Sequence, residues 1–96
     1  MASSKDYLAF LLDQFPDDGS VTYKPMMGEF LLYYRGKLFG GIYDNRFLLK
    51  PTKAILSFLP DAKRELPYTG AKEMLLVENV DDRDFLAELL KAIMED

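Results

Sequence analysis

The stretch from Glu29 to Lys50, EFLLYYRGKLFGGIYDNRFLLK, contains three short runs of apolar and aromatic residues separated by two turn signals. The first turn signal is Gly36 and the second is Asp44-Asn45. Glycine, asparagine and aspartate tolerate the left-handed backbone that tight hairpin turns require. The stretch therefore predicts an antiparallel meander of three strands, at residues 29–35, 37–43 and 46–50.

Helical patterns lie on both sides of this meander. Before it, apolar residues recur at helical spacing, and Ser3 is the expected N-cap with Asp6 as its capping-box partner. After it, Asp81 is the expected N-cap of a last helix, with Asp84 three residues further on. The two apolar stripes are Leu8, Leu11, Leu12 and Phe15, and Phe85, Leu86, Leu89, Leu90, Ile93 and Met94.

The rest of the chain carries weaker patterns and no linker or repeat. Pro25 restricts the residue before it to extended geometry. The remaining expected elements are an extended segment at 21–24, a short helix capped by Thr52 that runs to about Leu59, an irregular stretch at 60–70 and a strand at 72–78. We therefore expect one domain over residues 1–96, of the α+β class, with an antiparallel sheet and flanking helices.

Composition excludes several classes of function. The chain has no cysteine and no histidine, which excludes disulfides, thiolate nucleophiles and zinc sites built on sulfur or imidazole. The usual general base near neutral pH is also missing. No apolar run approaches the roughly 20 residues of a membrane span, and the first residues do not resemble a secretory signal. We expect a cytoplasmic, non-enzymatic protein that uses no cofactor, metal or membrane.

The net charge of −4 is unevenly distributed, with acidic ends and an excess of basic residues between residues 24 and 72. Aromatic and basic residues are mixed on the expected strands there, and these are the residue types that a base-stacking platform uses. An acidic chain is nevertheless a poor binder of phosphates, and the Gly-Phe-x-Phe pattern of an RNA-recognition motif is absent. We do not expect direct binding of nucleic acid. The residues of this mixed set are Tyr33, Tyr34, Phe39 and Tyr43 with Arg35, Lys37, Arg46 and Lys50.

The expected strands are apolar on both faces, as in Phe30–Tyr34. The strands of a sheet that helices cover on one face only should instead alternate apolar and polar residues. Either helices cover both faces, or a partner or a second copy buries one of them, and the sequence leaves both open. Gly40-Gly41 inside a strand predicts a bulge or a close approach, and we favour a helix aromatic packed over the pair. Met26-Met27 is a flexible apolar pair, and we expect it to fill space in the core rather than to form an interface.

Several of these segments together form a family pattern. Met26 or Met27 with Gly28, then Gly36-Lys37, then Phe47-Leu48-Leu49-Lys50, resemble the N-terminal domain of the TfoX/Sxy competence-regulator family. The resemblance extends over almost the whole chain, which ends where the family's separate C-terminal domain would begin. One departure is Met27-Gly28-Glu29 in place of the usual Phe-Gly-Gly. The resemblance implies a two-layer fold of an antiparallel sheet with flanking helices, similar to the type III secretion-chaperone-like fold. It also implies homodimers and binding of other proteins, and it carries over no catalytic residues.

We therefore expect a protein-interaction module that regulates transcription or competence genes and binds a protein partner or itself as a homodimer. The alternatives are a nucleic-acid-associated regulator that uses the basic-aromatic strands, and a small-molecule binder with a pocket near Gly40-Gly41. The candidate partner-binding residues are Met26, Met27, Gly28, Tyr33, Arg35, Tyr43, Arg46 and Lys50.

Overall fold

The computed structural model describes residues 3–95, which form six strands and three helices. The expected α+β class is confirmed, and the strands form one antiparallel sheet of order β1-β2-β3-β4-β6-β5. In chain order the elements are α1 (Lys5–Gln14), β1 (Val21–Met26), β2 (Glu29–Tyr34), β3 (Lys37–Tyr43), β4 (Arg46–Leu49), α2 (Lys53–Phe58), β5 (Arg64–Glu65), β6 (Met74–Val77) and α3 (Arg83–Met94).

The meander has four strands rather than three, because β1 extends through Pro25 and pairs with β2 along its whole length. Proline has no N–H to donate to a ladder, and β1 tolerates it because β1 is an edge strand. The three connecting turns each have two residues of positive φ, the backbone that matches the twist of a hairpin. These turns are Met27-Gly28, Arg35-Gly36 and Asp44-Asn45.

The predicted helices are present, but two N-caps are each one residue later than expected. Ser4, not Ser3, accepts the backbone N–H of Tyr7 and caps α1. Ser3 is tied to the sheet instead, since its own N–H donates to the carbonyl of Gly28. Asp82, not Asp81, caps α3. The cap expected at Thr52 is confirmed for α2.

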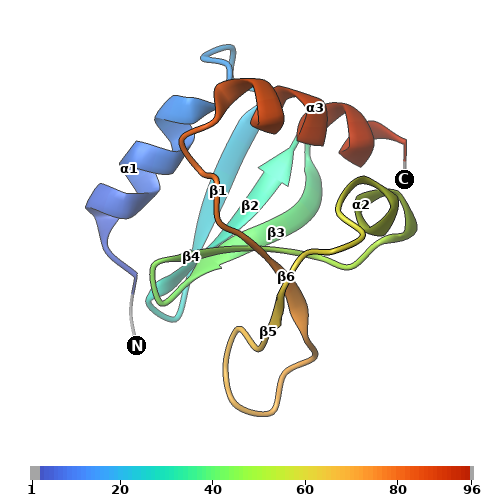
Figure 1. Cartoon of the computed structure of the whole chain (residues 1–96). Helices are drawn as coiled ribbons and strands as arrows, with labels where there is room; N and C mark the ends of the chain where they lie inside the picture. The colour runs from blue at the N-terminus through green and yellow to red at the C-terminus, as the bar shows by residue number, and fades with distance from the viewer. Residues whose placement is uncertain (1–2, 96) are drawn as a thin grey trace.

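All three helices lie on one face of the sheet (Figure 1), and their apolar stripes meet the strands in one buried cluster. At its centre Phe15, Phe39 and Phe47 pack edge to face, with ring centroids 6.2–6.3 Å apart. Each of these side chains is at most 3% exposed. Because aromatic edges are attracted to aromatic faces, this trio fixes α1 against the central strands.

The glycine pair in β3 lies beside an irregular pairing with β2, where Phe39 is the extra residue. The expected bulge is therefore confirmed, together with a close approach of other chain segments. A Cβ on Gly40 would lie 2.3 Å from the carbonyl oxygen of Leu48, and one on Gly41 would lie 2.7 Å from that of Phe30. Backbone carbonyls are thus the nearest neighbours, and the aromatic ring beside Gly41 is that of Tyr43 in β3, not the expected helix aromatic. These contacts fill the space beside both glycines.

The second face of the sheet carries no helix within residues 3–95, so of the two alternatives that the sequence left open, helices on both faces is the wrong one. The loop between β5 and β6 folds beneath this face instead (Figure 1). Leu48 and Tyr43 are buried on this face, whereas Leu31 and Tyr33 of β2 are only half-buried. The chain therefore covers part of its second face with a loop and leaves the rest open.

Within the described part of the chain, each helix falls short of the length and apolar character needed to cross a membrane.

Candidate functional site

A groove with a volume of about 880 Å³ lies where two meander turns meet the loop between β5 and β6. We call it the tyrosine groove. Its aromatic side chains are Tyr43 and Tyr68, and its apolar ones are Met26, Met27, Leu66 and Pro67. Glu29, Asp44, Arg46 and Thr69 complete its lining.

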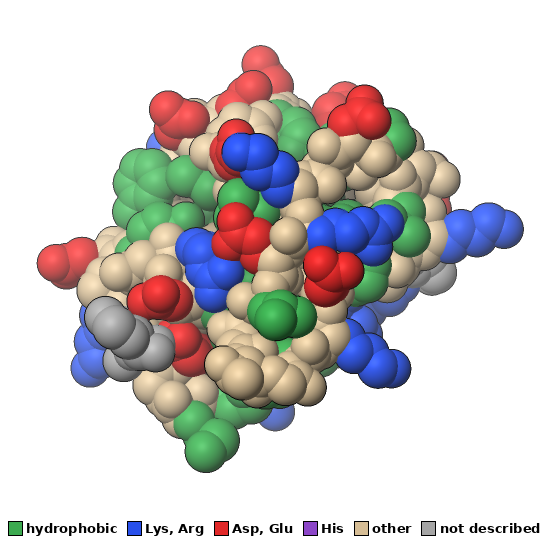
Figure 2. Space-filling view, turned by 60° about the horizontal axis from the view of Figure 1, so that its bottom comes forward, with side chains coloured by type: hydrophobic (Ala, Val, Ile, Leu, Met, Phe, Trp, Pro, Cys, Tyr) green, Lys and Arg blue, Asp and Glu red, His purple; other side chains and the backbone are tan. Residues whose placement is uncertain are grey.

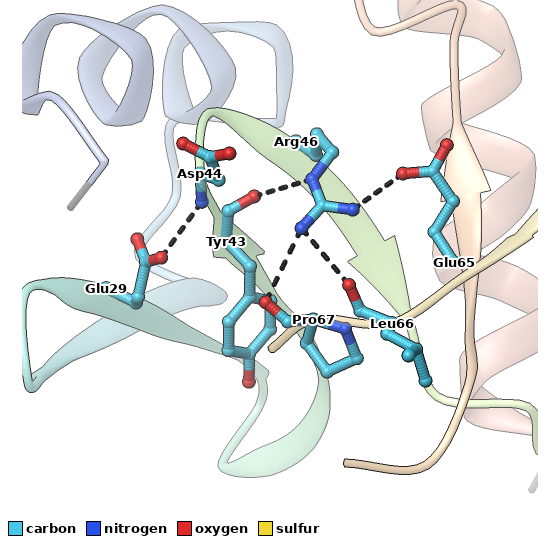
Figure 3. A network of polar contacts seen from close by, with 7 residues as sticks. All are labelled: Glu29, Tyr43, Asp44, Arg46, Glu65, Leu66 and Pro67. Carbon is cyan, nitrogen blue, oxygen red and sulfur yellow. Dashed lines mark hydrogen bonds and ion pairs between the residues drawn. The ribbon is translucent and has the colours of Figure 1, made fainter. Parts of the chain in front are cut away.

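Arg46 connects the loop to the meander (Figure 3). Its Nη1 donates to Glu65 Oε1 at 2.6 Å, and its Nε donates to the carbonyl of Tyr43 at 3.1 Å. Its Nη2 donates to the carbonyls of Leu66 at 3.2 Å and Pro67 at 3.4 Å. A planar guanidinium suits several fixed acceptors at once. The positive charge of Arg46 is therefore directed at its own chain rather than at a ligand.

We expect Arg46→Lys to loosen the loop and to lower the free energy of unfolding by about 1–2 kcal/mol, because an ammonium cannot reach all four acceptors together. Hydrogen exchange at the amide of Ala71, which donates to the carbonyl of Tyr68 at 3.2 Å, measures the loosening. Arg64→Lys is the matched control, since Arg64 is exposed on β5. Equal loop protection in both variants would show that Arg46 is not the anchor.

Two tyrosines with neighbouring rings line the groove. The rings of Tyr43 and Tyr68 are 6.3 Å apart at an interplanar angle of 51°. Tyr43 is 6% exposed and Tyr68 is 59% exposed, so the second ring presents most of the free aromatic surface. Burial, then the neighbouring Tyr68 and the carboxylate of Glu29, raise the pKa of Tyr43. Its hydroxyl therefore stays protonated at neutral pH.

The carboxylate of Glu29 is held at the other side of the groove by two donors. The Ser3 hydroxyl donates to Oε1, and the backbone N–H of Asp44 donates to Oε2 at 2.9 Å. The N–H of Asn45 in turn donates to Ser3 Oγ at 3.0 Å. These bonds join the segment before α1 to the β3–β4 turn, and they orient Glu29 without neutralising its charge.

Four of the eight candidate residues come together in the tyrosine groove: Met26, Met27, Tyr43 and Arg46. Gly28 lies beside them in the β1–β2 turn, where its φ of 86° favours glycine. The expectation that the methionine pair fills the core is wrong for Met27, which is 98% exposed. Its place at the tip of a hairpin turn gives it nothing to pack against.

The other three candidates lie elsewhere. Tyr33 is on the second face away from the groove, with Lys24 Nζ 5.6 Å from its ring centroid. Arg35 is in the β2–β3 turn and stacks over Tyr34 at 5.4 Å. Lys50 follows β4 and is exposed.

The mixed aromatic and basic residues do not form a continuous platform. Phe39 and Tyr34 are buried in the helix-side cluster, whereas Tyr43 is on the opposite face under Tyr68. The alternation of side chains along strands separates them in this way.

The sequence patterns did not indicate Glu29, Asp44, Leu66 or Thr69 as site residues. Tyr68 lies within the stretch at 60–70 that the sequence predicted to be irregular. An aromatic residue among turn residues is the one signal that could have marked this loop.

Over residues 3–95, no three His, Cys, Asp or Glu side chains are grouped so as to hold a metal ion.

The fold and the groove define a small α+β domain with an open sheet face. No family model matches the chain, and no solved structure matches it at a significant level. The chain is 39% identical over 80 residues to the "Uncharacterized 12.7 kDa protein in trpE 5'region" of Spirochaeta aurantia. The match covers 83% of this chain and 70% of that protein. The chain therefore belongs to the same family as that spirochaete protein.

Proposed function

We propose that the chain is a non-enzymatic, cytoplasmic protein-interaction module that binds an extended segment of another protein in the tyrosine groove. The observation that carries this proposal is the exposure of Met27, Leu66 and Tyr68, at 98%, 47% and 59%. These are three of the six large hydrophobic side chains exposed within residues 3–95, and all three line the groove. Apolar side chains gathered at one concave surface are typical of protein interfaces.

The surroundings of the groove favour a protein segment over a phosphate-bearing ligand. Glu29 and Asp44 would repel phosphates, and the charge of Arg46 is already paired with Glu65. Figure 2, which brings the lower side of the molecule forward, shows hydrophobic side chains between acidic and basic ones. A mixed surface of this kind resembles the core and polar rim of a protein interface.

The resemblance to the TfoX/Sxy N-terminal domain supports a regulatory role for this interaction, in transcription or competence. It also supports a fold of the type III secretion-chaperone kind and self-association as a homodimer. A second copy of the chain is accordingly the competing occupant of the groove.

The proposal is tested by affinity capture of the tagged protein from native extract, with and without nuclease treatment, read by mass spectrometry. Leu66→Glu places a charge in the groove, and Phe10→Glu is its control on α1, because the two side chains are 47% and 42% exposed. We expect one protein to be captured stoichiometrically by the wild type and by Phe10→Glu, and at least about tenfold less by Leu66→Glu.

Three other outcomes would contradict the proposal. A captured protein that Leu66→Glu retains would bind elsewhere on the surface. Proteins that disappear with nuclease would indicate nucleic acid as the ligand. Recovery of the chain alone, as a dimer in sedimentation, would make a second copy the occupant.

A further inference from the structure

The tyrosine groove has an unbalanced negative charge. Glu29 and Asp44 line it, and within residues 3–95 neither forms an ion pair with lysine or arginine. The groove's basic side chain, Arg46, is paired with Glu65 at 2.6 Å. The groove therefore offers negative charge to a ligand and no free positive charge in return.

The aromatic surface of the groove adds a second feature that suits a cation. The exposed ring of Tyr68 stands over the buried ring of Tyr43 at a tilt of 51°. A cation within about 6 Å of a ring centroid is attracted to the ring face. Two such contacts occur within the chain itself, where Lys24 lies over the ring of Tyr33 and Arg35 lies over the ring of Tyr34.

The apolar lining supplies the third feature. Met26, Leu66 and Pro67 border the tyrosines. Lysine and arginine side chains lay their methylene groups along apolar surface and keep the charged end near polar groups. The apolar side chains of the groove suit the methylene groups of a lysine or arginine, and its exposed aromatic ring and anchored carboxylate suit the charged end.

We propose that the tyrosine groove recognises a lysine or arginine side chain of the bound segment, with its methylenes on Met26 and Leu66, its cation on the Tyr68 ring and its charge opposed by Glu29. This inference rests on the proposed function, because it names the residue type that the partner inserts.

Other side chains suit the groove less well. An acidic residue would face Glu29 and Asp44 and be repelled. A purely apolar residue would displace water from the Glu29 carboxylate without returning a counter-charge, which costs free energy. A basic residue offsets that desolvation, and it also gives selectivity and faster association.

The test uses a display library of random 12-residue peptides selected on the whole chain, followed by synthesis of the enriched peptides. NMR of the ¹⁵N-labelled protein locates each peptide through shifts at Tyr68, Thr69 and Asp44. For each peptide, a matched version replaces its basic residue with norleucine, which keeps the methylenes and removes the charge. Calorimetry measures both versions against the wild type, Glu29→Gln, Tyr68→Ala and the control Glu88→Gln on α3.

We expect a lysine or arginine at one fixed position of the groove-binding peptides. Glu29→Gln should weaken their binding about fivefold, and Tyr68→Ala about 3- to 30-fold. The norleucine peptide should bind weakly and be insensitive to Glu29→Gln, because the two changes remove the same interaction. Glu88→Gln should have no effect, since Glu88 pairs with Lys91 on a helix across the sheet.

The possible failures separate the two proposals. Two results would overturn this inference and leave the protein-interaction proposal intact. In the first, peptides shift the groove residues but carry no lysine or arginine at a fixed position. In the second, Glu29→Gln weakens the lysine or arginine peptide and its norleucine version by the same factor. An empty selection, or peptides that shift only residues outside the groove, would overturn both.

Discussion

Replacing Phe47 with alanine is expected to lower the free energy of unfolding by about 3–5 kcal/mol, a large part of the roughly 5–15 kcal/mol that stabilises a domain. Phe47 is 0% exposed and lies in β4, next to the middle of the sheet. Its ring centroid is 6.2 Å from that of Phe15 and 6.3 Å from that of Phe39. Alanine would remove both edge-to-face contacts and leave a cavity between α1 and the strands.

Urea unfolding followed by circular dichroism measures this loss. Phe10→Ala is the control, because Phe10 is a phenylalanine of α1 that is 42% exposed, and the substitution should change stability by less than about 1 kcal/mol. Similar losses in the two variants would mean that the aromatic trio is not the centre of the core.

Gly40→Ala is expected to destabilise the domain by about 3 kcal/mol or more. The added Cβ would lie 2.3 Å from the carbonyl oxygen of Leu48 and 3.2 Å from the Cα of Leu49. Both neighbours are backbone atoms of β4, so relief requires the two strands to separate. Thermal and urea unfolding measure the effect.

The matched control for Gly40→Ala is Gly19→Ala. Gly19 has a φ of +80° and no atom within 4 Å of an added Cβ. That substitution should cost only the backbone penalty of about 1–2 kcal/mol. A smaller loss for Gly40→Ala than for Gly19→Ala would contradict the close approach of β3 and β4.

The sequence predicted those parts of the fold whose signals are local. Gly36 and Asp44-Asn45 marked two hairpin turns, and the helical stripes marked α1 and α3. Both N-caps were predicted one residue too early. For α1, Ser3 and Ser4 are adjacent residues of the same type, so the local sequence does not distinguish them as caps. The choice between them is made by Glu29, which accepts from Ser3 across 26 residues. The pair Asp81 and Asp82 presented the same local ambiguity.

The candidate site was predictable only in part, because it is assembled from distant segments. Met26, Met27, Tyr43 and Arg46 belong to the meander, whose course was clear. The loop that completes the groove has no periodicity, and its β5 strand has only two residues. Arg46 reaches it across 19–21 residues. Nothing in the sequence shows that this arginine would bind its own chain.

The most direct test of the central claim is photocrosslinking in native extract, with benzoylphenylalanine placed at Met27 or, as a control, at Phe10. Both side chains are exposed, but only Met27 lines the tyrosine groove. We predict that position 27 crosslinks to one partner protein, that position 10 does not, and that Leu66→Glu abolishes the crosslink. Crosslinking of that partner from position 10 alone, or from position 27 only to a second copy of the chain, would contradict the account.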